Sequence, residues 1–165
     1  NFIYTSLKQK TAFAAVPGAL VGAIPPALGW VAGGKELLDP RIGVVALFFF
    51  IWQIPHFWLL LLDFAADYEK AGHPSLTRAF TTEQLKRIIL IWILSTAVSC
   101  LLIPVFDFVS SYLTHLSLLA ATLWLVWNAV KFFRSNFSET SLRRLFMKFN
   151  IYAVCIILLL SLDKL

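Results

Sequence analysis

Five long apolar runs constrain the fold of this chain more than any other feature of its sequence. A helix needs roughly 20 mostly apolar residues to cross the hydrocarbon core of a membrane. The runs lie at about residues 12–32, 42–62, 87–106, 110–133 and 145–162. Five such runs in one short chain leave few polar faces for a soluble fold. The pattern predicts an all-α, polytopic membrane helix bundle with about five transmembrane helices, built as a single domain over residues 1–165.

The charged residues support a position in lipid. They make up 14% of the chain, against about 25% in soluble domains. Alternate connectors lie on the same side of a membrane. Of the 14 Lys and Arg residues, 11 then lie on one side and 3 on the other. The positive-inside rule then places the N-terminal segment and the connectors 63–86 and 134–144 in the cytoplasm. We expect a protein of the cytoplasmic membrane of a prokaryote, with no nucleic-acid partner.

The net charge of +5 has two interpretations. One is topological, because basic residues gather on the cytoplasmic side of membrane proteins. The other is an anionic partner, either lipid headgroups or a phosphorylated substrate. The two interpretations are compatible.

Prolines interrupt two of the spans. The first contains Pro17-Gly18 and Pro25-Pro26, and the second contains Pro55. Proline inside a helix removes a backbone donor and frees carbonyl groups, which lipid tolerates only where protein or a cavity covers them. The adjacent pair Pro25-Pro26 therefore predicts a break in the first span, beside a cavity.

The second span and the residues after it carry a polar face. On a helix continued to Asp67, the residues His56, Asp63 and Asp67 lie within about 20° of one direction, with Trp52 and Gln53 beside them. The two carboxylates are one turn apart and repel each other unless a cation lies between them. Mg²⁺ is typically held by one or two carboxylates together with substrate phosphates. The alternative is that both acids are ordinary solvated residues at a helix end.

Two further residues have both a functional and a structural interpretation. His56 lies about 9 Å inside its span, where ionisable residues usually face the bundle interior. It is either a substrate-facing group, such as a proton acceptor, or a histidine bonded to a neighbouring helix. Lys8, on the same side as Asp67, is either a point charge for a diphosphate or a surface anchor. Together these groups suit a substrate with an anionic head and an apolar tail, as prenyl diphosphates have.

Several motifs resemble those of protohaem IX farnesyltransferases, also called haem O synthases, which are UbiA-type intramembrane prenyltransferases. The most distinctive is WQIPHFW at 52–58, accompanied by YTSLK at 4–8 and DYEKAG at 67–72. The match covers about residues 2–80 and rests beyond them on the number and spacing of the spans. The family fold is a bundle of nine helices around a central cavity, and this chain resembles helices five to nine.

The resemblance implies the transfer of a farnesyl group from farnesyl diphosphate to haem b, which gives haem O for haem–copper oxidases. It also implies Mg²⁺ as the cofactor, held at an acidic loop on the cytoplasmic side. The implied catalytic residues are Asp67, His56 and Lys8. The implied substrate-binding residues are Tyr4, Lys8, Trp52, Gln53, His56 and Tyr68, and the implied metal ligands are Asp67 and Asp63.

The chain also departs from the family pattern. The first acidic motif, Asn-x-x-x-Asp-x-x-x-Asp, does not occur in these 165 residues. We therefore expect the C-terminal part of a larger prenyltransferase domain, inactive without its N-terminal helices. Gln9, Ala65 and Ala66 stand where many members have basic residues. The substitutions at Gln9 and Ala66 favour one alternative, a non-catalytic membrane scaffold. The PHFW stretch argues against the other alternative, a prenyltransferase for an aromatic or quinone precursor.

Overall fold

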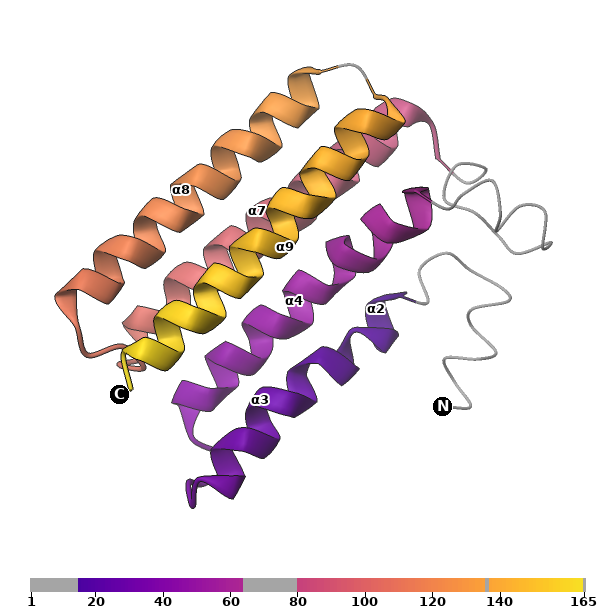
Figure 1. Cartoon of the computed structure of the whole chain (residues 1–165). Helices are drawn as coiled ribbons and strands as arrows, with labels where there is room; N and C mark the ends of the chain where they lie inside the picture. Colours follow the sequence, from indigo (N-terminus) through magenta and orange to yellow (C-terminus); the bar gives the residue numbers. More distant parts are fainter. Residues whose placement is uncertain (1–14, 64–79, 136, 165) are drawn as a thin grey trace.

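The computed structural model describes residues 15–63, 80–135 and 137–164, which form six α-helices and no strand (Figure 1). The helices are α2 (Ala15–Gly18), α3 (Leu20–Ala32), α4 (Pro40–Asp63), α7 (Thr82–Val105), α8 (Tyr112–Arg134) and α9 (Glu139–Leu162). With α2 and α3 counted as one span, five segments are long and apolar enough to cross a membrane. The prediction of an all-α bundle with five transmembrane helices is confirmed.

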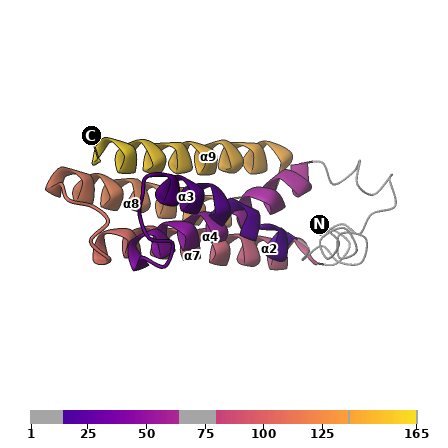
Figure 2. The same ribbon diagram turned by 90° about the horizontal axis from the view of Figure 1, so that it is seen from below.

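Four of the long helices close into a bundle. In this bundle α4 packs against α7, α7 against α8, α8 against α9, and α9 against α4, while α3 packs on α4. The view turned by 90° shows α9 along one face of the bundle and α7 on the opposite side (Figure 2). The largest core side chains are fully buried: Phe48, Ile54 and Trp58 from α4, Ile89 and Ile93 from α7, Leu118 and Leu125 from α8, and Phe149 and Ile156 from α9.

Helices α7 and α9 begin earlier than the apolar runs at 87 and 145 predicted, because a capping box starts each of them. The Thr81 hydroxyl accepts from the Gln84 backbone N–H at 3.3 Å, and the Gln84 side chain accepts from the Thr81 N–H at 2.9 Å. Ser138 and Ser141 make the same reciprocal pair at the start of α9. Such pairs satisfy backbone donors that the first helical turn leaves open. The helices therefore extend beyond the apolar residues into polar sequence.

The predicted break at Pro25-Pro26 is wrong. Helix α3 continues through both prolines, and the interruption lies at Ala19, between α2 and α3. The fixed φ of proline is compatible with a helix, so the main loss is the hydrogen bonds to the carbonyls four residues earlier. These are the carbonyls of Val21 and Gly22. All four residues line a cavity, as the prediction of a neighbouring cavity requires.

A carboxylate joins the end of α9 to the start of α8. Asp163 accepts hydrogen bonds from the backbone N–H groups of Ser110 and Ser111, each at 2.9 Å. Burial acts to raise the pKa of Asp163, but these two N–H groups, with Thr114 and Lys164, outweigh it and lower the pKa to about 2. A carboxylate at a helix N-terminus is favoured by the open N–H groups and the helix dipole. The ionised Asp163 therefore stabilises the fold fully at a pH above 3.8, the ordinary pKa of an aspartate. This stabilisation is lost as the pH falls through about 2, the pKa of Asp163 in the folded protein.

Helices α3 and α4 approach most closely at Gly22. A Cβ atom added to Gly22 would overlap Oε1 of Gln53 and would lie 3.3 Å from the carbonyl oxygen of Phe49. A Cβ atom added to Gly29, two turns later on the same helix, would meet nothing within 4 Å. The two glycines therefore differ in their packing although they share one helix.

Gly22→Ala and Gly29→Ala form a matched pair that tests this approach. Alanine is favoured over glycine in a helix by about 0.8–1 kcal/mol, so Gly29→Ala should retain or slightly raise the Tm of the detergent-solubilised protein. Gly22→Ala gains the same helix propensity, but its Cβ must turn the flexible end of Gln53 aside and shift the Phe49 carbonyl oxygen slightly, which offsets part of that gain. We expect Gly22→Ala to melt below Gly29→Ala. Equal melting temperatures would contradict the close approach at Gly22.

Candidate active site

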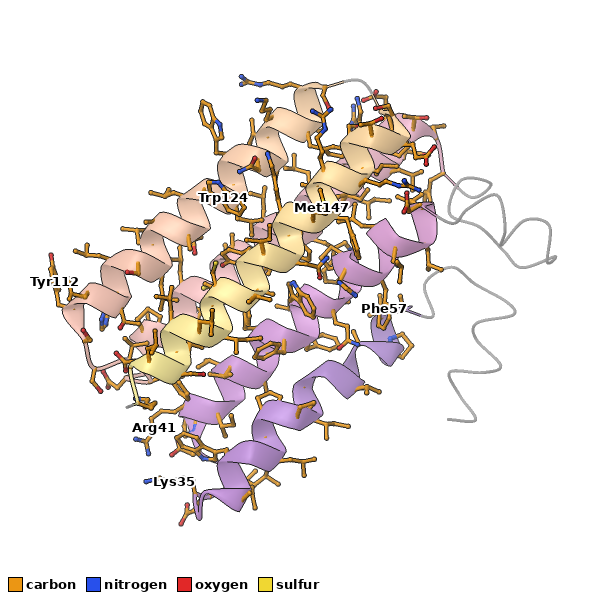
Figure 3. The ribbon with its side chains drawn as sticks, viewed as in Figure 1. Lys35, Arg41, Phe57, Tyr112, Trp124 and Met147 are labelled. Carbon is orange, nitrogen blue, oxygen red and sulfur yellow. The ribbon has the colours of Figure 1, made fainter. Side chains whose placement is uncertain are left out.

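A cavity of about 870 Å³ lies between α3, α4 and α9. Ligand pockets typically measure about 300–1,000 Å³. Most of its lining is apolar, and its polar and aromatic members from α4 are Phe49, Trp52, Gln53, His56 and Phe57. Phe57 lies where α4 passes α2 (Figure 3). Three of the residues that the sequence singled out, Trp52, Gln53 and His56, line this cavity.

The segment at 52–58 is a continuous part of α4, and its side chains point either into the bundle core or into the cavity. Ile54 and Trp58 are 0% and 1% exposed and belong to the bundle core. Trp52, Gln53 and His56 line the cavity, because residues three or four positions apart share one face of a helix. Burying Ile54 and Trp58 therefore directs the other three side chains toward the cavity. Of the five residues predicted to share one face, Trp52, Gln53 and His56 lie together at the cavity, Asp63 does not line it, and Asp67 lies outside the described residues.

The His56 ring is held by a hydrogen bond to Asn150 of α9. Its Nδ1 lies 2.9 Å from Oδ1 of Asn150, and Nδ2 of Asn150 donates to the Phe146 carbonyl at 2.8 Å. That carbonyl can only accept, so the amide nitrogen must face it and Oδ1 must face the histidine. Nδ1 of His56 is then the donor, and a neutral ring has its lone pair on Nε2. Among the described residues no group bonds to Nε2.

Aromatic rings surround His56. Its ring centroid lies 4.8 Å from that of Trp52 and 5.3 Å from that of Phe146. Trp52 in turn stacks on Phe149, with centroids 6.1 Å apart and planes 21° apart. The indole N–H of Trp52 is buried and has no acceptor within the part of the chain that the structure describes. Of these rings, Trp52 and His56 line the cavity, whereas Phe146 and Phe149 do not and support them from α9.

The predicted acidic site is described only in part. Asp63 ends α4, about 10 Å along the helix axis from His56. Its carboxylate accepts from Nε of Arg143 at 2.9 Å, and that arginine also pairs with Glu139. Within residues 15–63, 80–135 and 137–164, no group of three or more His, Cys, Asp or Glu residues is placed to hold a metal ion. These residues alone do not fit a magnesium centre, so the metal role of Asp63 stays a prediction.

Four of the predicted residues, Tyr4, Lys8, Asp67 and Tyr68, lie outside the described residues. Sequence reasoning missed Asn150, which the fold brings to His56 from 94 positions away. The available signal was an amide inside an apolar run. A side-chain amide in a membrane span needs partners and often marks a contact between helices.

Comparisons with known proteins agree with the motifs. A sequence model described as the UbiA prenyltransferase family matches residues 1–152. A protein of Oleidesulfovibrio alaskensis named protoheme IX farnesyltransferase is 37% identical over 110 residues, which are 67% of this chain and 39% of the relative. The protein of the same name from Psychromonas ingrahamii is 37% identical over 142 residues, or 85% of this chain and 44% of the relative.

A mitochondrial protein of that name from Yarrowia lipolytica is 44% identical over 71 residues, which are 43% of this chain and 15% of the relative. The matched part of the chain thus covers less than half the length of each of these three relatives. No solved structure was found to match it.

In the variant Asn150→Leu, the His56 ring should no longer be held in a single tautomer. With ¹⁵N-labelled histidine, the NMR spectrum of the wild-type protein should show His56 protonated at Nδ1 and unprotonated at Nε2. In Asn150→Leu the acceptor is gone, so we expect a mixture of both tautomers. His115 is the internal control, because its Nδ1 donates to the Ser111 carbonyl at 2.8 Å in α8 and should not change. An unaltered His56 spectrum in Asn150→Leu would argue against this hydrogen bond.

Proposed function

The chain belongs to the UbiA prenyltransferase family, and we propose that it contributes five helices to a protohaem IX farnesyltransferase. The proposed reaction transfers the farnesyl group of farnesyl diphosphate to a vinyl group of haem b and gives haem O. The observation that carries this proposal is the convergence of Trp52, Gln53 and His56 on one large cavity with aromatic walls. The names of the curated relatives support a haem substrate over a quinone precursor.

The cavity suits the two apolar substrates. Haem is a flat aromatic macrocycle, and aromatic side chains bind such rings by offset stacking. The rings of Phe49, Trp52, His56 and Phe57 line the cavity and present such a surface, and the fully buried Phe149 stacks against Trp52 from the core. The apolar lining from α3, including Val21 and the Pro25-Pro26 pair, suits a farnesyl chain.

The proposed chemistry requires a base beside the vinyl group. The bond between farnesyl C1 and the diphosphate oxygen breaks, and C1 bonds to the terminal vinyl carbon. Water then adds to the other vinyl carbon, which carries the positive charge, and its oxygen becomes the hydroxyl of the product. That water must lose a proton. His56 donates its Nδ1–H to Asn150, so Nε2 is the atom that would accept the proton.

The leaving diphosphate carries negative charge and needs cations near it. By resemblance we assign Asp67 as the ligand of Mg²⁺, and Lys8, Tyr4 and Tyr68 as contacts to the substrates. When bound, the metal ion would stabilise charge on the diphosphate. The carboxylate of Asp63 is already engaged by Arg143, which supports Asp67 over Asp63 as the metal ligand.

We place this end of the bundle in the cytoplasm, with the protein in the inner membrane of a prokaryote. Ten Lys and Arg residues are described, and seven of them lie at the end where α4 and α8 finish: Lys86, Arg87, Lys131, Arg134, Arg143, Arg144 and Lys148. The other three are Lys35, Arg41 and Lys164. Lys35 and Arg41 mark the opposite end of the bundle (Figure 3). The positive-inside rule supports this orientation.

Replacing His56 by Gln should lower haem O formation by about 10²–10⁴-fold, the usual effect of losing a general base. The protein would be expressed from its complete reading frame in a host that makes no haem O, and extracted haems would be separated by chromatography. His115→Gln is the control, because His115 lies on α8 and does not line the cavity. Full activity of His56→Gln would exclude His56 as the proton acceptor.

Replacing Asp67 by Asn should reduce haem O formation about a hundredfold or more in the same assay. The variant would no longer hold the Mg²⁺ ion that stabilises negative charge on the leaving diphosphate. Asp63→Asn removes the same charge four residues earlier and should change activity less than about threefold, since an exposed ion pair contributes little. Unchanged function in Asp67→Asn, with the protein folded, would favour a scaffold over an enzyme. Equal losses in both variants would make Asp63 a second ligand.

A further inference from the structure

A small basic pocket lies between α8 and α9, and we propose that it binds the phosphate group of an anionic membrane lipid. Its volume is about 110 Å³, several times the about 10–15 Å³ that one water molecule needs. Three cations line it, Lys131 from α8 and Arg144 and Lys148 from α9, hereafter the pocket cations. Asn128 and Ser141 add polar groups to the lining.

The pocket is separate from the cavity proposed for farnesyl transfer. At 100° per residue, Arg144 and Lys148 lie about 160° around α9 from Phe146 and Asn150. The latter two residues contact His56. Helix α9 therefore stands between the cavity and the basic pocket, and the pocket cations are not placed to hold the diphosphate of a substrate in that cavity.

No carboxylate of the described residues neutralises the pocket cations. The ion pairs described for α9 are made by Arg143, with Asp63 and Glu139. Lys148 is half-buried, and its Nζ donates to the amide oxygen of Asn128 at 2.6 Å. A neutral amide satisfies one donor of an ammonium group and none of its charge, so the pocket favours an anion.

The positive-inside rule alone does not explain this arrangement. It accounts for basic residues at this end of the bundle, but it does not require that cations from two helices line one pocket. Clusters of Lys and Arg beside membrane helices, including pockets between them, bind anionic lipid headgroups. Lys131 lies in the last turn of α8 and Arg144 in the second turn of α9, close to where lipid phosphates are found.

Exposed apolar side chains next to the pocket favour a lipid over soluble phosphate. Trp127, four positions before Lys131 on α8, is 72% exposed, and Met147, beside Lys148 on α9, is 58% exposed. Trp124, on the same stretch of α8, is 41% exposed. Tryptophan is enriched at the level of the headgroups. These side chains would contact the acyl chains of a lipid whose phosphate occupies the pocket.

The test is lipid binding by the full chain in detergent micelles, counted by native mass spectrometry. The wild-type protein should bind phosphatidylglycerol about tenfold or more tightly than phosphatidylcholine, and Arg144→Gln with Lys148→Gln should abolish this preference. The matched control is Arg87→Gln with Arg134→Gln, which removes the same charge at the same end from residues that do not line the pocket. This control should retain the preference.

A third variant guards against misfolding. Lys131 is exposed, so Lys131→Gln should fold normally and lose part of the preference. Equal losses in the control and in the pocket double variant would overturn the site and leave only general electrostatic attraction. Inorganic phosphate is added alone in a further arm. If it binds as tightly as phosphatidylglycerol and displaces it, the occupant is soluble phosphate and the lipid assignment fails.

Discussion

A hydrocarbon interior offers no partner to a backbone N–H or C=O group, and the described bundle is shaped by this constraint. All of its spans are helical, and several polar side chains inside them bond to carbonyls of their own helix. Thr96 and Ser95 of α7, for example, donate to carbonyls four residues earlier at 2.9 Å each. Proline is the exception, because it removes a donor. Pro25-Pro26 lie in α3, where they line the cavity, whereas Pro55 of α4 is buried in the bundle.

The same constraint makes α4 the helix that positions the candidate site. It contacts α3, α7 and α9, and it buries Phe48, Ile54 and Trp58 against them. Because these residues fix the rotation of α4, the opposite side chains Trp52 and His56 must face the cavity. The direction of the site thus follows from burial in the core, and not from any bond that His56 makes.

The sequence predicts the fold well because length and hydropathy decide which segments span a membrane. It predicts the shared face of Trp52, Gln53 and His56 because residues three or four positions apart in the sequence lie on the same face of a helix. It could not place Asn150 beside His56, or Arg143 beside Asp63, since these pairs are 94 and 80 positions apart. Only the packing of α9 on α4 brings them together. The prediction for Asp67 concerns a residue outside the described ranges, so it stays a prediction.

Two asparagines hydrogen-bond the basic side chains that lie on opposite faces of α9 or pack against it. Asn150 donates its Nδ2–H to the Phe146 carbonyl and accepts from His56, and Asn128 donates to the Trp124 carbonyl and accepts from Lys148. In each case the amide nitrogen bonds within its own helix, so the oxygen points to a donor on a neighbouring helix.

This arrangement satisfies both ends of the amide, which lowers the penalty for burying it. An aspartate would lose the bond to the carbonyl, because two oxygens would then face each other. A glutamine would place the oxygen one bond too far away. Asparagine is therefore the residue that can join a helix backbone to a basic group on the next helix. The bundle uses it once at the cavity and once at the basic pocket.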